Sequence, residues 1–511
     1  MTIQDPAEKG FTTDQDDLAE IPEVDEHATD GLAPDTTTHP DSAAVFASQP
    51  DLSALDIRPS PGKPREYHFP RFERHALSNG MTLINAHVPG RALICAQLLL
   101  PGGGWTEPHD LGGVTVLTGR AMTEGTARRD ANDFIEASER LGAEIHADAT
   151  WEALSASLEV PRSRFGAALA LLAEMVFEPA FPEAEVNRLR EERLNDLLQA
   201  WSDPRRRAER VFPETIFVAG TPYRRPLGGI QSSVGKVDRE ALLARHQQLL
   251  DPSSATLIVA GDLAGASVLD MAEEHMGSRS AAGGNRPAGD QSGNAVKADG
   301  RGGRVVLVDR PGAPQSELRI GHIGVQRKTP DFHAIAVLNA ILGGTFNSRL
   351  NRVIREERGY TYGISSAFDM RSRPGPFVIR TAVESAATVP AILDTLQIVR
   401  DIRESEVQAD ELAVARDYLV GVFPLRFESA AQVASALGGL TVFGLPDDEL
   451  DRYRPSVAAV TAADVLAAAG SHIRPDELSI VVIGDVEQVE PALSAVSLGE
   501  LTVISKDATP E

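Results

Sequence analysis

Arg355 and Tyr362 carry types of side chain that can act on a carbonyl group. They lie seven residues apart in the run ILGGTFNSRLNRVIREERGYTYGISS, residues 341–366. When hydroxide attacks a peptide carbonyl, negative charge develops on the oxygen. A phenol and a guanidinium can both stabilise that charge, and one such donor is typically worth about 3 kcal/mol. A simpler interpretation is also open, in which Arg355 caps a helix or pairs within the charged run REER and Tyr362 packs as a strand aromatic.

Two glycines, Gly343 and Gly344, stand among the elements that would position this pair. The run predicts the end of one helix, a turn at these glycines, a second helix opening at residues 347–349, and an exit through Gly359 into a strand. Gly343 and Gly344 can simply terminate a helix, because glycine is the commonest residue at that position.

Metal and nucleophilic chemistry have no comparable candidates. The twelve histidines are scattered, with no pair at i,i+3 or i,i+4 spacing. We interpret His109 and His146 as surface or structural residues, and Glu124 as a helix-surface carboxylate rather than a base. No nucleophile and base stand in a recognisable arrangement. We therefore expect no metal to be bound by this chain.

The charge and cysteine content narrow the classes of partner and compartment. The formal net charge is -25, but residues 1–60 alone contribute -12 of it, so the rest of the chain is only moderately acidic. This composition favours neither nucleic acid nor an anionic membrane as a partner. The single cysteine, Cys95, excludes an intramolecular disulfide framework and is compatible with a reducing compartment.

No secretory signal or membrane span is expected. The chain opens MTIQDPAEKG, without a basic start or an apolar run. The longest apolar stretch, residues 165–181, is interrupted by Glu174 and Glu178 and is too short to cross a bilayer. We expect a cytoplasmic protein.

The apolar pattern predicts an α+β fold, because strands and helices mix without the strict alternation of a parallel sheet. In the first half we expect strands at 81–88, 92–100 and 255–260, an extended stretch at 143–160, and helices at 113–124, 131–141, 164–178 and 183–201. In the second half we expect strands at 304–309 and 318–324, helices at 331–342, 390–404 and 410–424, and a terminal strand.

The order of elements repeats, which predicts two domains of the same fold. The segments PSSATLIVAGDL, residues 252–263, and PDELSIVVIGDV, residues 475–486, share their spacing from proline to Gly-Asp. The predicted organisation is a disordered acidic tail at 1–66, a first domain at 67–276, a Gly/Ser-rich linker at 277–303, a second domain at 304–504, and a tail at 505–511.

The sequence resembles the insulinase and mitochondrial processing peptidase family of inverted zincins. In the second half the resemblance rests on the run 341–366, and in the first half on PGGGWTEP and the segment from Gly113 to Gly125. Family members carry H-x-x-E-H within that segment, where two histidines one helical turn apart ligate zinc and the glutamate activates water. The resemblance implies two α+β domains, each a mostly antiparallel sheet packed with helices, that form half of a clamshell.

The zinc motif of the family is degenerate here. The five corresponding residues are Val116, Leu117, Thr118, Gly119 and Arg120. The third ligand, a glutamate in the family, aligns with Asn195 or Asp196. A lone Asp196 would not hold zinc, and Arg120 would add a repelling positive charge. The resemblance therefore implies a chain without zinc.

The resemblance assigns Arg355 and Tyr362 to the substrate carbonyl or oxyanion, and Gly343 and Gly344 to a substrate-binding loop. In two-chain members one subunit brings zinc and the other brings the Arg/Tyr pair. We therefore expect a non-catalytic subunit, inactive alone, that supports endopeptidase activity in a heterodimer with a zinc-bearing homologous subunit and binds peptide or unfolded protein. The alternative is a proteolytically inert structural or peptide-binding protein with the same fold.

Overall fold

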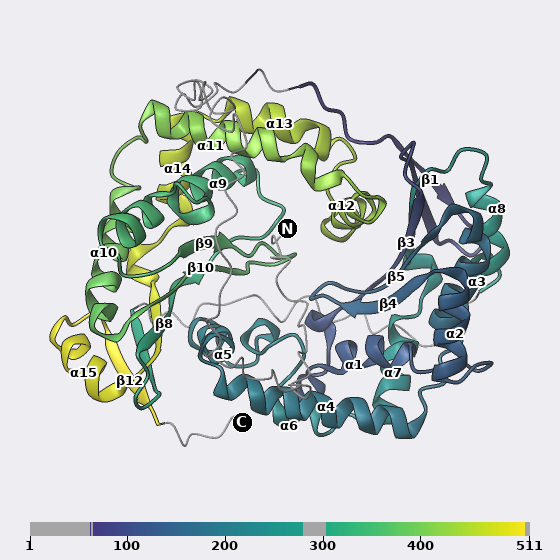
Figure 1. The fold of residues 1–511 in the computed structure, drawn as a ribbon, viewed down its shortest axis with the longest axis horizontal. Helices are drawn as coiled ribbons and strands as arrows, with labels where there is room; N and C mark the ends of the chain where they lie inside the picture. The colour runs from purple at the N-terminus through teal and green to yellow at the C-terminus, as the bar shows by residue number, and fades with distance from the viewer. Residues whose placement is uncertain (1–61, 63–64, 280–302, 506–511) are drawn as a thin grey trace, which may run out of the picture. The chain divides into compact units, whose positions relative to one another are not determined.

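The structure is a computed structural model that describes residues 62, 65–279 and 303–505. The predicted acidic tail (1–66), linker (277–303) and C-terminal tail (505–511) lie almost entirely outside these residues. From Tyr67 onward the chain forms one unit that contains two six-stranded sheets covered by helices (Figure 1). The α+β fold predicted from the sequence is confirmed.

The first sheet is mixed and mostly antiparallel, with the order β1-β2-β6-β3-β5-β4. Only the pair β2 and β6 is parallel. The extended stretch predicted at 143–160 is in fact two antiparallel strands, because the chain turns at residues 150–152. The strands are β1 (Phe72–Ala76), β2 (Thr82–His87), β3 (Leu93–Pro101), β4 (Glu144–Ala149), β5 (Ala153–Pro161) and β6 (Thr256–Gly261).

The second sheet has the order β12-β7-β11-β8-β10-β9. Its pairs β12 with β7 and β7 with β11 are parallel, and the other three are antiparallel. The strands are β7 (Arg304–Asp309), β8 (Gln315–Ile323), β9 (Ile364–Phe368), β10 (Pro376–Glu384), β11 (Ser479–Gly484) and β12 (Glu500–Ile504).

The two sheets repeat each other strand for strand except at one edge. β6 and β11, the two segments that resemble each other in sequence, both occupy the third place of their sheet and are buried along their whole length. Each follows a short 3-10 turn that opens on a proline, Pro252 or Pro475. The edge strands differ, because β1 comes from the start of the first half and β12 from the end of the second.

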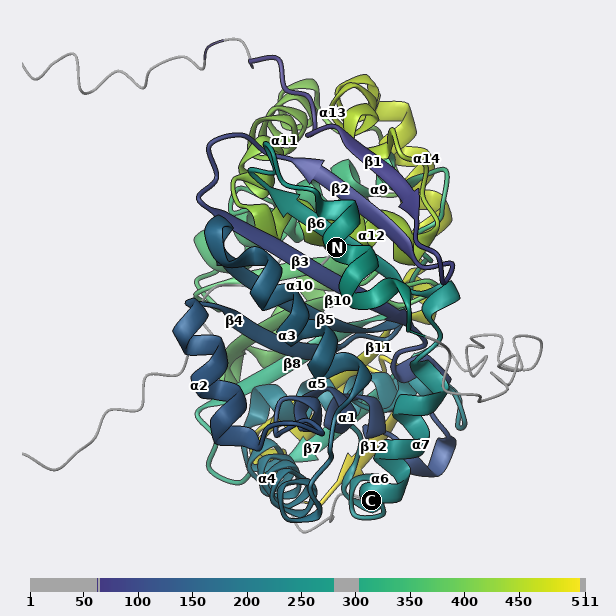
Figure 2. The same ribbon diagram turned by 90° about the vertical axis from the view of Figure 1, so that its right-hand side faces the viewer.

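Helices cover both sheets, as Figure 2 shows for the first of them. The first half contains α1 (Val114–Met122), α2 (Ala131–Leu141), α3 (Phe165–Phe177), α4 (Glu183–Ser202), α5 (Pro204–Ile216), α6 (Gln231–Val234), α7 (Arg239–Leu249) and α8 (Val268–Ala272). The second half contains α9 (Phe332–Asn339), α10 (Thr388–Asp401), α11 (Ala409–Val422), α12 (Ala430–Phe443), α13 (Glu449–Ala459), α14 (Ala462–His472) and α15 (Val486–Ala495). Two π-helical segments, η9 (Ala340–Gly344) and η10 (Asn351–Glu357), follow α9.

Each half also contributes a helix to the sheet of the other half. α12 packs on β3 and β6, and α5 packs on β8 and β11. Glu209 of α5 accepts hydrogen bonds from Arg319 of β8 and Arg380 of β10, both at 2.8 Å. The Arg319 side chain is fully buried, so this pairing supplies a counter-charge that its burial requires.

Among the described residues, no single helix is long and apolar enough to span a membrane. The helices at Glu449–Ala459 and Ala462–Glu477, bent by 107° from each other, meet the length and composition criteria only when taken together.

Candidate functional site

Arg355 and Tyr362 lie on either side of one helix-to-strand junction in the second half. Arg355 belongs to η10, and Tyr362 precedes the edge strand β9. The Tyr362 side chain is 95% exposed, so it does not pack as a strand aromatic. Its neighbourhood is therefore open to a ligand or a partner chain.

The Arg355 guanidinium lies over the ring of Phe346, with Cζ 4.1 Å from the ring centroid. Its neighbours in the charged run behave differently, because Arg358 pairs with Asp394 at 3.0 Å and Arg352 lies 3.8 Å from Glu357. Within the described part of the chain no carboxylate pairs with Arg355. Its donors are thus not committed to an ion pair within the charged run, one of the two simpler roles considered for this residue; the other, capping a helix, stays open because Arg355 lies in the last turn of η10.

Backbone-directed hydrogen bonds hold this junction in place. Asn351, one turn before Arg355, is buried and bonds to both backbone groups of Ile364, the first residue of β9. On the other side, the hydroxyl of Thr381 in β10 lies 3.0 Å from both the Thr361 hydroxyl and the Gly363 carbonyl oxygen, and it can donate its one hydrogen to either. Tyr362 therefore projects from a backbone that is fixed on both sides.

Gly343 and Gly344 form the end of η9 rather than a separate turn. Gly343 is buried against β9, and a Cβ added there would stand 2.6 Å from Ser366 Oγ. Gly344 is exposed, and an added Cβ would stand 2.7 Å from Asn339 Nδ2. Both positions need glycine for close approach, and neither adopts a positive φ.

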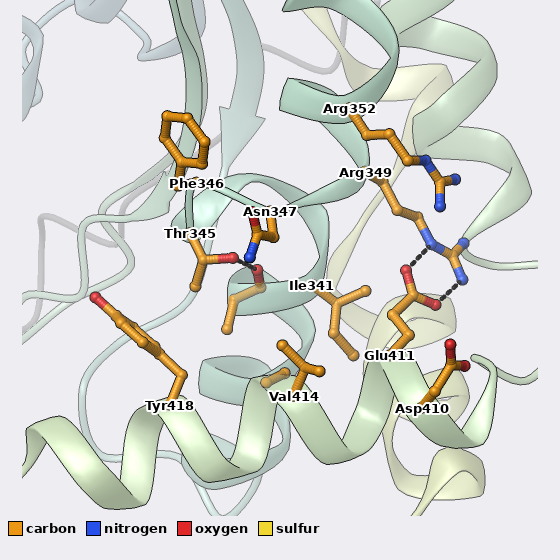
Figure 3. Close-up of a pocket in the computed structure, with 12 residues that line it drawn as sticks. Ile341, Thr345, Phe346, Asn347, Arg349, Arg352, Asp410, Glu411, Val414 and Tyr418 are labelled. Carbon is orange, nitrogen blue, oxygen red and sulfur yellow. Dashed lines mark hydrogen bonds and ion pairs between the residues drawn. The ribbon is translucent and has the colours of Figure 1, made fainter. Parts of the chain in front are cut away.

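A pocket of about 320 Å³ lies next to these glycines, and sequence reasoning missed it. Figure 3 shows its lining, which comes from residues 340–352 and from α11. Phe346 was visible in the run 341–366, but its contact with Arg355 and its place in the pocket wall depend on the fold of the loop.

The positions that correspond to zinc ligands in the resemblance lie in the first half, on α1 and α4. Val116 is partly exposed, whereas Arg120 and Asn195 are exposed. Gly119 is buried where α1 meets β4 and β5, and an added Cβ would stand 3.0 Å from Leu154 Cδ1. No side chain at these four positions is a zinc ligand.

Asp196, the remaining carboxylate of that region, is already paired. It accepts hydrogen bonds from Arg193 and, at 2.7 Å, from Arg206. Burial lowers the pKa of Arg193, an effect that the charge of Asp196 opposes and those of Arg206 and Arg120 reinforce. The region is therefore rich in arginine, which disfavours a divalent cation.

Ion pairs connect α1 to α4 in the same region. Arg188 of α4 pairs with Glu124 at 2.8 Å and with Glu192 at 2.6 Å, and Arg120 of α1 lies 3.5 Å from Glu192. Glu124 is thus held by a cation rather than free to act as a base. The Arg120–Glu192 contact joins α1 to α4, and the Arg188–Glu124 pair joins α4 to the residues just after α1, both without a metal.

His109 and His146 do not form a metal site either. His109 is exposed in a 3-10 turn, and His146 is exposed on β4, 3.6 Å from Asp148. Across residues 65–279 and 303–505, no group of three or more His, Cys, Asp or Glu side chains could hold a metal ion. The residues present therefore do not fit zinc.

Two family models match the chain. The model described as insulinase (peptidase family M16) matches residues 87–229, and the model described as the peptidase M16 inactive domain matches residues 236–419. The second match contains Gly343, Gly344, Arg355 and Tyr362, and the first contains all four degenerate zinc positions.

Curated relatives are similar over most of their length. An uncharacterized zinc protease of Mycobacterium tuberculosis is 25% identical over 431 residues, covering 84% of this chain and 96% of that protein. A protein of Helicobacter pylori named non-peptidase homolog YmxG is 22% identical over 397 residues, covering 76% of this chain and 88% of that protein.

Solved structures share the fold. A peptidase M16 inactive domain from Pseudomonas fluorescens has a TM-score of 0.74 at 23% identity, covering 81% of this chain and 98% of that chain. A protease from Helicobacter pylori has a TM-score of 0.74 at 16% identity, covering 82% of this chain and all of that chain.

Proposed function

The chain belongs to the insulinase-like peptidase family as a non-catalytic member, and we propose that it is the non-catalytic subunit of a heterodimeric zinc endopeptidase. A homologous partner with an intact H-x-x-E-H motif would bring the metal. This chain would bring the side chains that bind the peptide. The substrate would be an extended peptide or an unfolded protein segment.

The observation that carries this proposal is that the side chains of Arg355 and Tyr362 are both available to a ligand. One has no carboxylate partner among the described residues, and the other is 95% exposed. Hydrogen bonds that include Asn351 fix the junction between them. An inert scaffold has no evident use for an unpaired guanidinium and an exposed phenol held in this way. A guanidinium and a phenol that project from a fixed backbone would, in contrast, suit a developing oxyanion, because both are strong hydrogen-bond donors.

Each part of the site would have a separate role. Zinc in the partner would supply an activated water. Arg355 and Tyr362 would donate hydrogen bonds to the carbonyl oxygen as its charge develops.

Reconstitution tests this proposal. The full chain and a zinc-motif homologue are purified separately, and cleavage of an unfolded protein is measured for each alone and for the mixture. We expect cleavage only in the mixture, with a loss of roughly 100-fold or more for Arg355→Ala or Tyr362→Phe. Undiminished activity of the double variant would refute the proposal. Assembly of the mixture without any cleavage would favour the structural or peptide-binding alternative.

A further inference from the structure

The pocket lined by residues 340–352 and α11 has no role in the function proposed above. Its volume of about 320 Å³ lies at the lower end of the range for ligand sites. Its floor is apolar, formed by Ala340 and Ile341 of η9 and Ala415 of α11. A cavity of this size and lining suits one bulky side chain.

Three exposed apolar side chains surround this floor. Phe346 is 63% exposed, Val414 is 56% exposed and Tyr418 is 46% exposed. Val414 and Tyr418 are four residues apart on α11, so they share one face of the helix. Clusters of exposed apolar residues are uncommon on a protein surface unless they bind something.

The charged residues of the pocket lie mainly to one side. In the view of Figure 3, Arg349, Arg352, Asp410 and Glu411 gather opposite Phe346 and Tyr418. Arg349 and Glu411 form a bidentate pair with both distances at 2.7 Å, so their charges compensate each other. Asp410 has no ion pair among the described residues, but it lies on the charged side of the pocket, away from Phe346 and Tyr418. The side formed by Phe346 and Tyr418 therefore offers contact area rather than charge.

The loop that forms one wall is held before any ligand arrives. The Thr345 hydroxyl donates to the Ala340 carbonyl at 3.0 Å, and Asn351 Nδ2 donates to the Thr345 carbonyl at 3.2 Å. A wall fixed in this way lowers the entropy lost on binding.

Phe346 connects the pocket to the proposed carbonyl site, because the same ring lines the pocket and contacts Arg355. A peptide whose carbonyl reaches Arg355 can therefore extend to the pocket. In an extended peptide, successive side chains point to opposite sides at a rise of about 3.3 Å per residue. A side chain near the bound carbonyl can then turn toward the pocket.

We propose that this pocket binds one large apolar side chain of the substrate peptide, either aromatic or a long aliphatic chain such as leucine. A charged side chain is disfavoured against the apolar floor and the Phe346 and Tyr418 side, because there it would lose water without meeting a counter-charge. The inference rests on the proposed function for the presence of a peptide. It adds a preference for one class of residue in that peptide.

The test measures binding to the isolated full chain, without a partner. Labelled peptides that are identical except for one central residue (Ala, Leu, Phe, Lys or Glu) are titrated by fluorescence anisotropy. We expect Leu and Phe to bind roughly tenfold to a hundredfold more tightly than Ala, and Lys and Glu no better than Ala.

Val414→Glu should abolish this preference by placing a charge in the wall. Ile135→Glu is the matched control, since Ile135 is an aliphatic residue of α2 with a similar exposure of 50%, and it should keep the preference. Equal affinity for all peptides, no binding, or a preference unchanged in Val414→Glu would overturn the inference.

The two proposals can fail separately. If Arg355→Ala and Tyr362→Phe leave cleavage by the mixture intact while Val414→Glu removes the Leu and Phe preference, the proposed function fails and the pocket assignment stands. If cleavage depends on Arg355 and Tyr362 but no peptide shows the preference, only the pocket assignment fails.

Discussion

The side-chain amide of Asn351 substitutes for a neighbouring strand at Ile364. Its Nδ2 donates to the Ile364 carbonyl at 2.8 Å, and its Oδ1 accepts from the Ile364 amide at 3.3 Å. Since Ile364 follows Tyr362 by two residues and Asn351 precedes Arg355 by four, this contact sets how the two donors are spaced.

Replacing Asn351 should weaken the junction. Asn351→Ala leaves buried backbone groups of Ile364 without partners, which should lower the free energy of unfolding by about 1–3 kcal/mol. Chemical denaturation measures this loss, and hydrogen exchange at the Ile364 amide should accelerate. Asn195→Ala, at an exposed position of α4, is the control and should change neither quantity. Equal stability of the two variants would show that the contact contributes little.

Gly343 should not tolerate a side chain. In Gly343→Ala the new Cβ would stand 2.7 Å from the Ser366 backbone nitrogen and 2.8 Å from Leu350 Cδ1, so η9 would have to move away from β9. We expect a loss of about 1–3 kcal/mol in the free energy of unfolding. Gly439→Ala in α12 meets no atom within 4 Å and should be neutral or stabilising. A neutral Gly343→Ala variant would contradict the packing argument.

The purified chain should contain far less than one zinc per molecule by elemental analysis. The variant Val116→His, Arg120→His, Asn195→Glu should raise the zinc content, because residues four apart on α1 share one face and Arg120 already contacts α4 through Glu192. Adding Gly119→Glu should instead reduce stability, since a Cβ there would stand 3.1 Å from the Ala147 carbonyl oxygen. One zinc per molecule in the unaltered chain would refute the proposal that this chain cannot bind the metal.

Stability should fall as the pH decreases from about 6.5 toward 4. Burial, assisted by the charge of Arg474, lowers the pKa of His322 to about 4, whereas an unfolded histidine has a pKa of about 6.5. In this window the unfolded chain binds a proton that the folded chain does not, so acid favours unfolding by up to about 1.4 kcal/mol per pH unit. Denaturation at several pH values should show that the free energy of unfolding depends less steeply on pH in His322→Gln than in the unaltered chain. The same pH dependence in both proteins would exclude His322 as the cause of the acid destabilisation.

Much of the fold could be predicted, because its signals are local. The helix expected at 164–178 is α3, and its apolar residues Leu169, Leu171, Leu172 and Met175 are all buried. The repeat between β6 and β11 was visible as a shared spacing. The packing of α5 and α12 on the opposite sheets was not predictable, since it depends on contacts between residues far apart in the chain.

The candidate site was predicted in outline but not in detail. Arg355 and Tyr362 were identified from their spacing and resemblance, but their availability depends on neighbours that sequence does not reveal. In the sequence, Asn351 looks like an ordinary polar helix residue. Its hydrogen bonds to the Ile364 backbone depend on the packing of β9 beside η10, which the sequence does not reveal. Phe346 and Tyr418 line one pocket although they are 72 residues apart, because α11 packs beside the end of η9.

The rate of peptide cleavage by the assembled heterodimer, measured under single-turnover conditions, tests the central claim most directly. Tyr362→Phe removes only the phenolic oxygen from a side chain that is 95% exposed, so folding and assembly should be unaffected. Tyr67→Phe makes the same change at a ring that stacks on Phe427, outside the proposed binding site, and serves as the control. If Tyr362 stabilises the oxyanion, its variant should cleave roughly 100-fold to 1000-fold more slowly, while the control should cleave at the normal rate. Equal rates for Tyr362→Phe and the unaltered chain would contradict the account.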